Sequence, residues 1–412
     1  MRDRITIARV LFACAAAGLL PGVAAGQQLT ETEVVSRALA ESARVRAIRA
    51  RSAEVGAEQL LRRVPPNPVV SFQQEHTGGT TDRFLLVEHE LTTSGRVRLF
   101  REAGEAAVAA ADLRAIRSEF EIRQDARGAF AELLAAQARL AEVSKTVATL
   151  TELSGRLSER EAAGDGSRFD RLRALREVAE LRAEHGLAEA AVAAARARLA
   201  GLLGMPGTPP LVAAGAVVPA PALPTLEAVL TTARARRSDL VAFDSELRRF
   251  ELERQAALRL GRPEPIVRGG WKQTSVGNVA GSRGYALTAG LKLPLFSRGQ
   301  AETSVANARL ATAHAERDAL AIDIEQQVRG AHARASQLQT LIGSYTRDAL
   351  EASRELIRIA TVAYDEGELG ILELLDAHRA LVTAELRAID LLTAARLASI
   401  ELERAIGEEV VR

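Results

Sequence analysis

Residues 364–381 read YDEGELGILELLDAHRAL, and a weaker copy of this pattern lies 203 positions upstream, at residues 161–176, EAAGDGSRFDRLRALR. The alignment sets Gly367 on Gly164 and Glu373 on Asp170, and the same offset sets Gly407 on Gly204. The chain is therefore a tandem duplication of a glycine-containing turn between two long helical runs. Because such a hairpin cannot bury its apolar stripe alone, the copies must pack on each other or on other chains.

The first 25 residues have the pattern of a secretory signal peptide, with a basic start, an apolar core at residues 10–20 and small residues before the expected cleavage site. Cys14 is the only cysteine, and it lies inside this segment. A lipoprotein that begins at Cys14 is the alternative, which the bulky Phe12 disfavours. Removal of the segment leaves a mature chain without thiols, which excludes disulfides and thiolate metal sites.

The composition indicates long, solvated helices. Charged residues make up 26% of the chain and aromatic residues 3%, and the net charge is +1. Basic and acidic residues alternate along the helical runs, which is typical of solvated faces, and no basic patch is visible. The sequence therefore argues against a nucleic-acid partner.

The first repeat covers residues 26–204. A capping box at Thr30 opens a helix that we expect to reach about Arg63. Next comes a β-hairpin at 69–91 with a longer loop at 76–82. It is followed by a long helix at 96–163 and a return helix at 168–203. The long helix would span roughly 100 Å at 1.5 Å per residue. It carries a coiled-coil seam of Leu140, Val143, Val147, Leu150, Ser154 and Leu157.

A proline-rich linker at 205–224 leads to the second repeat at 225–412. A helix is expected from Thr225 to about Leu260, followed by a β-hairpin at 266–293 around a loop at 276–284. A long helix at 300–364, a turn, and a return helix at 371–408 complete the order. The fold class is thus mostly α with a small β part.

Each predicted strand has one apolar and one polar face, and four strands cannot satisfy their own edges. In an exported protein this pattern favours an outer-membrane β-barrel, and such barrels need at least about eight strands, so several chains would contribute to one barrel. An aromatic girdle at the membrane boundary would contain Phe72, Phe84, Trp271 and Tyr285. A small soluble sheet that caps a coiled coil is the alternative.

The duplicated order of helix, hairpin, very long helix, turn and helix resembles the TolC-type outer-membrane efflux family, and its heavy-metal and drug efflux branch above all. The residues that carry the likeness are LPLFSRGQ at 293–300, YDEG at 364–367, ILELLDA at 371–377 and LAGLLG at 199–204. The resemblance implies a homotrimer with a 12-stranded barrel in outer-membrane lipid and an α-helical tunnel across the periplasm. It also implies a passive exit duct, supplied by a periplasmic adaptor (membrane fusion) protein and an inner-membrane transporter of the RND or a similar type.

The resemblance further assigns residues to two sites. Carboxylates at the periplasmic constriction correspond to Glu373 and Asp376, and a ring of three at each position would favour cations. The first repeat departs from the pattern, because Arg173 is the residue that aligns with Asp376. The tips on which the adaptor docks correspond to Gly164, Asp165, Gly166, Ser167, Gly367, Glu368, Leu369 and Gly370.

Simpler roles exist for these residues. Carboxylates in a first helical turn favour the helix dipole in any protein, and glycines commonly terminate helices. The histidines show no metal-binding spacing, and no cofactor motif or catalytic constellation occurs, so we expect neither a cofactor nor enzyme activity. The alternative function is a periplasmic coiled-coil adaptor or scaffold without a pore. The duplicated hairpin and the presence of only two strand pairs favour the duct.

Overall fold

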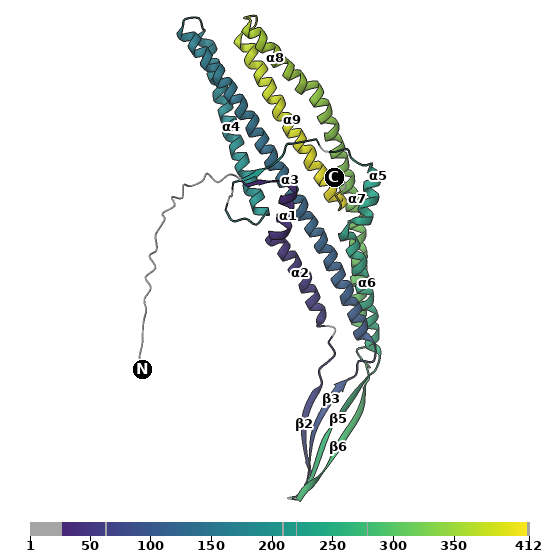
Figure 1. The fold of residues 1–412 in the computed structure, drawn as a ribbon. Coiled ribbons are helices and arrows are strands. Elements are labelled where there is room, and N and C mark those ends of the chain that lie inside the picture. Colours follow the sequence, from purple (N-terminus) through teal and green to yellow (C-terminus); the bar gives the residue numbers. More distant parts are fainter. Residues whose placement is uncertain (1–26, 62–63, 208–209, 220, 278, 410–412) are drawn as a thin grey trace, which may run out of the picture.

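The computed structural model describes residues 27–61, 64–207, 210–219, 221–277 and 279–409. The predicted signal peptide, including Cys14, lies outside the described residues. The chain forms a long rod, with two helical tips at one end and a four-stranded sheet at the other (Figure 1). Short elements and the C-terminal end of the last helix gather around the middle of the rod (Figure 1).

The elements of the first repeat are β1 (Gln27–Leu29), α1 (Glu31–Glu41), α2 (Ala43–Leu60), β2 (Val69–Thr77), β3 (Thr80–Glu90), α3 (Arg96–Ala162) and α4 (Arg168–Leu202). Those of the second repeat are β4 (Leu211–Ala213), α5 (Leu226–Arg236), α6 (Ser238–Leu258), the 3-10 helix η1 (Arg259–Gly261), β5 (Glu264–Val276), β6 (Val279–Lys292), α7 (Gln300–Tyr345), the π-helical turn η2 (Thr346–Leu350), α8 (Glu351–Asp365) and α9 (Ile371–Ile406). Among the described helices, none has both the length and the hydropathy that crossing a membrane requires.

The helix that begins after Thr30 is shorter than predicted. The capping box is present, because the Thr30 side chain accepts from the backbone N–H of Glu33 and the Glu33 carboxylate accepts from the backbone N–H of Thr30. However, Ser42 adopts an extended conformation (φ −62°, ψ 130°) and separates α1 from α2. Arg237 (φ −61°, ψ 103°) separates α5 from α6 in the same way. The single helices expected to Arg63 and Leu260 are therefore wrong, and each repeat has two shorter helices there.

Two further corrections concern the linker and the second long helix. The linker contains β4, which pairs in parallel with β1, with Leu29 opposite Ala213. The helix expected at 300–364 is interrupted by the π-helical turn η2. A π turn inserts one residue into the helical ladder, so it shifts the face that α8 presents relative to α7.

The four longer strands form one antiparallel sheet in the order β2-β3-β5-β6. Thr77 pairs with Thr80, so the first hairpin turns through Gly78 and Gly79 alone, both with positive φ. The longer loop predicted at 76–82 is therefore wrong. The loop predicted at 276–284 is also wrong, because β5 continues to Val276 and β6 begins at Val279.

Four apolar clusters are spaced along the described part of the rod, and the smallest packs α3 against α6 around Leu99 and Ala256. One packs α1, β1 and β4 against α3 and α4, around Leu29, Leu133 and Leu199. A second packs α5 against α7 and α9, around Val328 and Ile406. The third lies near the tips and joins α3, α4, α8 and α9. Of the predicted coiled-coil seam, four residues are buried and the other two are partly buried; the buried ones are Val143, Leu150, Ser154 and Leu157.

Candidate functional site

The two tips have closely similar backbone geometry. Gly164 and Gly367 follow α3 and α8 with φ of 85° and 78°. The next residue in each repeat donates its N–H to a carbonyl five positions back, Asp165 to Arg160 at 3.0 Å and Glu368 to Ala363 at 2.8 Å. This is the hydrogen bond with which a left-handed glycine ends a helix. The duplication seen in the sequence is thus also present in the turns.

The tips differ in how the following helix begins. Ser167 caps α4 by accepting from the N–H of Phe169 at 3.2 Å, whereas Gly370 precedes α9 without a side chain. A side chain at Gly166 would lie 2.6 Å from the backbone nitrogen of Glu161, so that turn requires glycine. Leu369 is partly buried against the tip cluster. Of the second tip, only Leu369 therefore helps to hold the hairpin to its neighbours.

Glu373 and Asp376 lie on the first two turns of α9, and both are exposed in the single chain. The side chain of Asp376 is 80% exposed and lies 3.9 Å from Arg379. Arg379 in turn donates to Glu177 of α4, with Nε to Oε1 at 3.1 Å. The two carboxylates are thus not buried by contacts within the chain, and the helix N-terminus favours their negative charge.

The first-repeat positions are occupied differently. Asp170 is half-buried on α4, and the exposed Arg173 replaces a carboxylate opposite Asp376. Next to the acidic pair, burial lowers the pKa of His378 below its ordinary value, which favours the neutral imidazole. Within the described ranges, no group of His, Cys, Asp and Glu side chains is arranged to hold a metal ion.

The sheet separates apolar and charged side chains between its two faces. Register aligns Phe72, Leu85, Trp271 and Tyr285 in one row across all four strands, called here the aromatic row. All four are exposed, Tyr285 to 86%. The same face, called the apolar face, continues with the exposed Val70, Val87, Val267, Leu287 and Leu291. Phe84 pairs with Gln73 and therefore lies on the opposite face, apart from the other three girdle candidates.

The opposite face, called the charged face, carries cross-strand ion pairs. Lys272 lies 2.9 Å from Asp82, and Arg268 pairs with Glu88. The ammonium group of Lys272 also lies 5.1 Å from the centre of the Phe84 ring. At the base of the sheet, buried Ser94 donates to Glu264 at 2.6 Å. One face is thus suited to lipid and the other to water, as the strand alternation predicts.

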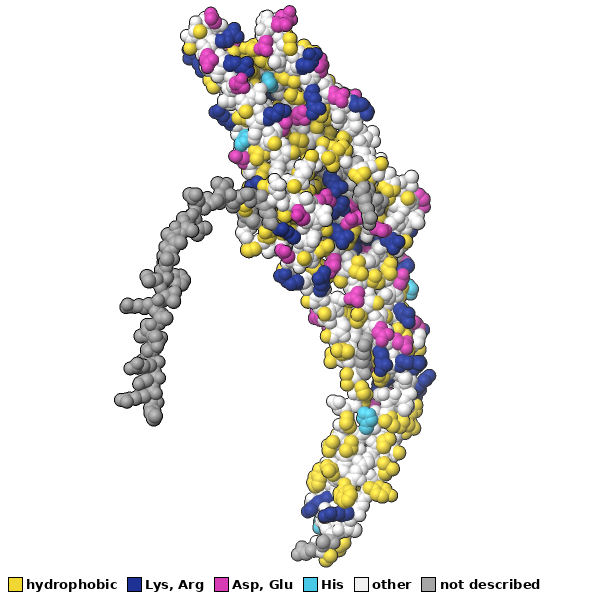
Figure 2. Space-filling model, in the orientation of Figure 1, with side chains coloured by type: hydrophobic (Ala, Val, Ile, Leu, Met, Phe, Trp, Pro, Cys, Tyr) yellow, Lys and Arg dark blue, Asp and Glu magenta, His cyan; other side chains and the backbone are white. Residues whose placement is uncertain are grey.

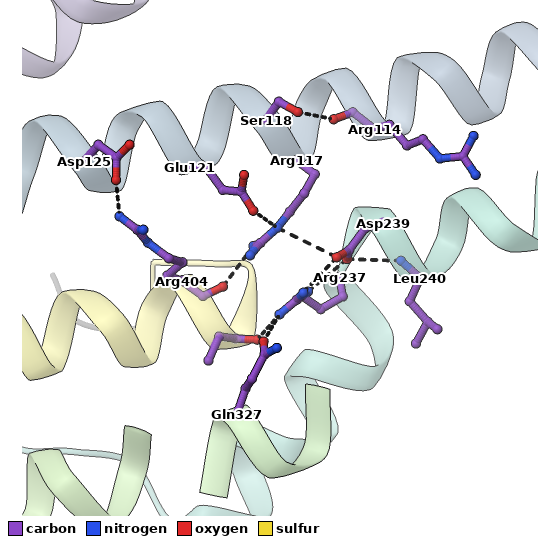
Figure 3. Close-up of polar contacts among 11 residues, drawn as sticks. Arg114, Arg117, Ser118, Glu121, Asp125, Arg237, Asp239, Leu240, Gln327 and Arg404 are labelled. Carbon is purple, nitrogen blue, oxygen red and sulfur yellow. Dashed lines mark hydrogen bonds and ion pairs between the residues drawn. The ribbon is translucent and has the colours of Figure 1, made fainter. Parts of the chain in front are cut away.

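Sequence reasoning missed a polar network at the middle of the rod. The Arg237 guanidinium is 4% exposed and donates to the carbonyl of Ala405, near the end of α9, at 2.8 Å. Arg117 of α3 donates to the carbonyl of Arg404 at 2.9 Å. Figure 3 shows Arg117 and Arg237 on either side of Asp239, both directed toward the end of α9.

The two arginines place positive charge at the negative end of a helix dipole. Burial alone would raise the pKa of Asp239, but its hydrogen bond with Arg237 and the charges of both arginines outweigh it and hold the pKa below its ordinary value. Burial and the charge of Arg237 lower the pKa of Arg117. No local motif predicts this network, because it joins three segments, at Arg117, Arg237–Asp239 and Arg404–Ala405, that are separated by more than a hundred positions.

Residues 229–408 match the family model for the outer membrane efflux protein. No curated protein matches the chain. A membrane protein from Pseudomonas aeruginosa has a similar structure, with a TM-score of 0.75 at 23% identity over 92% of this chain and 93% of that one. The open outer membrane channel MtrE of Neisseria gonorrhoeae has a TM-score of 0.75 at 21% identity, over 93% of this chain and 90% of MtrE. The outer membrane protein VceC of Vibrio cholerae has a TM-score of 0.71 at 17% identity, over 92% of this chain and 96% of VceC.

These structural likenesses establish the fold of the whole chain, two long helical hairpins on a four-stranded sheet. The family model thus covers most of the second repeat, and the remainder of the chain shares its fold with outer membrane proteins of known structure.

Proposed function

We propose that this chain is the outer-membrane exit duct of a tripartite efflux system, anchored by its sheet and extending into the periplasm by its helices. The observation that carries the proposal is the difference between the two faces of the sheet. The apolar face is exposed, whereas the charged face carries cross-strand ion pairs. Its strands have 9 to 14 residues, and a tilted transmembrane strand needs about 9–11. Figure 2 shows hydrophobic side chains along this end of the rod.

The free edges of the sheet support a shared barrel. β2 and β6 each have a hydrogen-bonded neighbour on one side only. They run in opposite directions, so β6 of one copy next to β2 of another continues the antiparallel order. Four strands per chain do not close a barrel, whereas three copies supply twelve. We therefore infer a homotrimer in which the aromatic row faces lipid at the membrane boundary.

The opposite end of the rod supports a charge-selective entrance. In a trimer, the exposed carboxylates of Glu373 and Asp376 would form rings of three charges each, and such rings favour cations in a narrow pore. The first-repeat counterpart of Asp376 is Arg173, so only the second repeat would contribute both rings. A passive duct needs no catalytic group or cofactor, and we assign the chain no enzyme activity.

The helical tips support docking of a periplasmic adaptor, which would connect the duct to an inner-membrane transporter of the RND or a similar type. On the shaft between the tips and the middle of the rod, a groove of about 580 Å³ lies between α3, α4 and α9. Most of its lining residues are charged, among them Glu180 and Arg387, so it would accept a helix that carries complementary charges. The tip residues 164–167 and 367–370 would be the first contacts of such a hairpin.

Mass and conductance together test this proposal. The mature chain, extracted from outer membranes, should have a detergent-corrected mass of three protomers by light scattering, and it should conduct ions in a planar bilayer. A soluble monomer or dimer from the periplasm would instead identify a coiled-coil scaffold. A membrane trimer without conductance would retain the barrel but contradict the duct.

A further inference from the structure

Two arginines lie on the apolar face, one row beyond the aromatic row. Register aligns Gln74, Arg83, Gln273 and Arg283 across the four strands, and this set is called the arginine row. It lies two residues closer to the hairpin turns than the aromatic row does. Two residues of a strand span roughly 7 Å. Figure 2 shows Lys and Arg side chains near the hairpin end of the sheet, beyond the hydrophobic stretch.

The basic residues of the sheet fall into two groups. Arg268, Lys272 and Lys292 lie on the charged face, and each pairs with an acidic residue of β3. Arg83 and Arg283 lie on the apolar face and are exposed. Within the described part of the chain, neither has an ion pair with a carboxylate.

The acidic residues of the four strands all lie on one face of the sheet. By register, all the carboxylates of the four strands lie on the charged face; they are Glu75, Asp82, Glu88, Glu90 and Glu264. The nearest partner of Arg83 is neutral, since its Nε donates to Oε1 of Gln74 at 3.2 Å. The remaining donors of the Arg83 fork and the whole Arg283 guanidinium are thus directed toward the surroundings of the sheet. An arginine fork without a carboxylate matches an external anion, and phosphate fits its geometry in a bidentate manner.

We propose that the arginine row binds the phosphate groups of an anionic lipid that carries phosphate monoesters, at the outer boundary of the membrane. The proposal rests on the proposed function, which places the apolar face in lipid. Aromatic rings settle at the level where acyl chains meet headgroups, so a row roughly 7 Å further out lies among the headgroup phosphates. Pairing of β6 with another copy uses backbone groups and leaves Arg283 directed outward. Three copies would form a belt of six arginines around the barrel.

Trp271 is the only tryptophan of the chain and lies in the neighbouring row, so its fluorescence reports on this boundary. The detergent-solubilised full-length mature protein is titrated in mixed micelles with bisphosphorylated lipid A or with phosphatidylcholine. The wild-type protein should bind lipid A more tightly. Arg83→Gln and Arg283→Gln should each weaken that binding about fivefold, the effect of one basic residue at an anionic surface. Arg248→Gln, at an exposed arginine of α6, is the matched control and should change nothing.

Three results would overturn the inference. Equal affinity of the wild-type protein for the two lipids would show that it has no preference for lipid phosphates. Unchanged lipid A binding by the double variant Arg83→Gln with Arg283→Gln would show that the arginine row is not the cause of the preference. Displacement of lipid A by an equal concentration of inorganic phosphate would assign the site to the free anion. Light scattering of the same sample separates this failure from that of the proposed function, because a membrane trimer without lipid preference contradicts only the inference drawn from the arginine row.

Discussion

Arg237 donates a hydrogen bond from Nη1 to the carbonyl oxygen of Ala405, 2.8 Å away, and thereby joins the break between α5 and α6 to the end of the chain's last helix. The same guanidinium forms a bidentate pair with Asp239, at 2.9 and 2.7 Å. The first repeat has Ser42 at the corresponding break, where its hydroxyl accepts from the N–H of Arg44. The buried Arg237 thus helps to hold the break between α5 and α6 against the end of α9, beside the apolar cluster of α5, α7 and α9.

Replacement of this cation should destabilise the protein. In Arg237→Ala, the buried Asp239 loses its bidentate partner and the Ala405 carbonyl loses its donor, so we expect a loss of roughly 3 kcal/mol in the free energy of unfolding. Arg236→Ala is the control, since its side chain is 69% exposed and lies 3.7 Å from Glu408. That variant should stay within about 0.5 kcal/mol of the wild type. Thermal unfolding of both variants in detergent measures the difference, and equal midpoints would contradict a structural role for Arg237.

The apolar face provides a direct test of its environment. Leu287 is 73% exposed in the single chain, so in water Leu287→Lys would be nearly neutral. In a bilayer, a lysine on the lipid face costs about 2–4 kcal/mol at the midplane and about 0–1 kcal/mol near the interfaces, and Leu287 lies one row inside the aromatic row at the boundary. We therefore expect Leu287→Lys to reduce the amount of trimer recovered from outer membranes and to lower its dissociation temperature.

The control for this variant places the same side chain on the other face. Gln73 lies on the charged face and donates to Glu75 at 2.6 Å, so Gln73→Lys retains an acidic neighbour. Recovery of the Gln73→Lys trimer should match the wild type. Equal recovery of both lysine variants would show that the apolar face does not contact lipid.

Acid should weaken the junction between the first helix and the rod. Burial would raise the pKa of Glu31, but hydrogen bonds and charges from Arg127 and Arg396 outweigh it, so the pKa is lowered in the folded chain. A carboxyl with a lowered folded pKa stabilises the protein above its unfolded pKa of about 4.3, and this stability is lost as the pH falls through the folded value. The melting temperature should therefore fall below pH 4, and less steeply in Glu31→Gln. Identical slopes in the two proteins would exclude Glu31 as a contributor.

The long helices and the two tips could be predicted from sequence because their signals are local. Gly164 and Gly367 adopt the left-handed conformation that ends a helix, and no proline interrupts the runs before them. The breaks at Ser42 and Arg237 could not be predicted in this way. Neither is proline or glycine, and Arg237 is extended because its side chain reaches α9, a partner 168 positions away.

The second hairpin shows how a local signal can mislead. Its glycines indicate a loop, yet a side chain at Gly281 would lie 1.3 Å from the carbonyl oxygen of Thr274. The glycine therefore permits close approach of β5 and β6 beside the bulge between Thr274 and Val276. For the candidate site, sequence alternation predicts the two faces of the sheet. Alternation along β3 already places Phe84 on the face of Glu88, whereas the row that joins Arg83 to Arg283 comes only from the strand pairing.

The acidic pair at the start of α9 should control ion preference while contributing little to the fold. Both carboxylates are exposed, so Glu373→Gln with Asp376→Asn removes charge at nearly constant shape and should lower the melting temperature only slightly, through loss of the favourable contact with the helix N-terminus. In a bilayer with a salt gradient, the reversal potential should shift toward a less cation-selective value. Asp165→Asn, on the other tip, is the control. An unchanged reversal potential in the double variant would contradict the assignment of these residues to the constriction.

The turn at the second tip should be intolerant of a side chain even where space is available. Gly367 has φ of 78°, and a Cβ added there would meet no heavy atom within 4 Å, so any cost of Gly367→Ala comes from the left-handed backbone alone. That cost is about 1–2 kcal/mol. Gly155→Ala, inside α3 and equally unobstructed, should instead stabilise by about 0.5–1 kcal/mol, because alanine favours the helix. Hydrogen exchange at residues 360–375 should accelerate in the first variant and not in the second. Equal exchange in both would mean that the tip does not need a left-handed residue and that another turn is accessible to it.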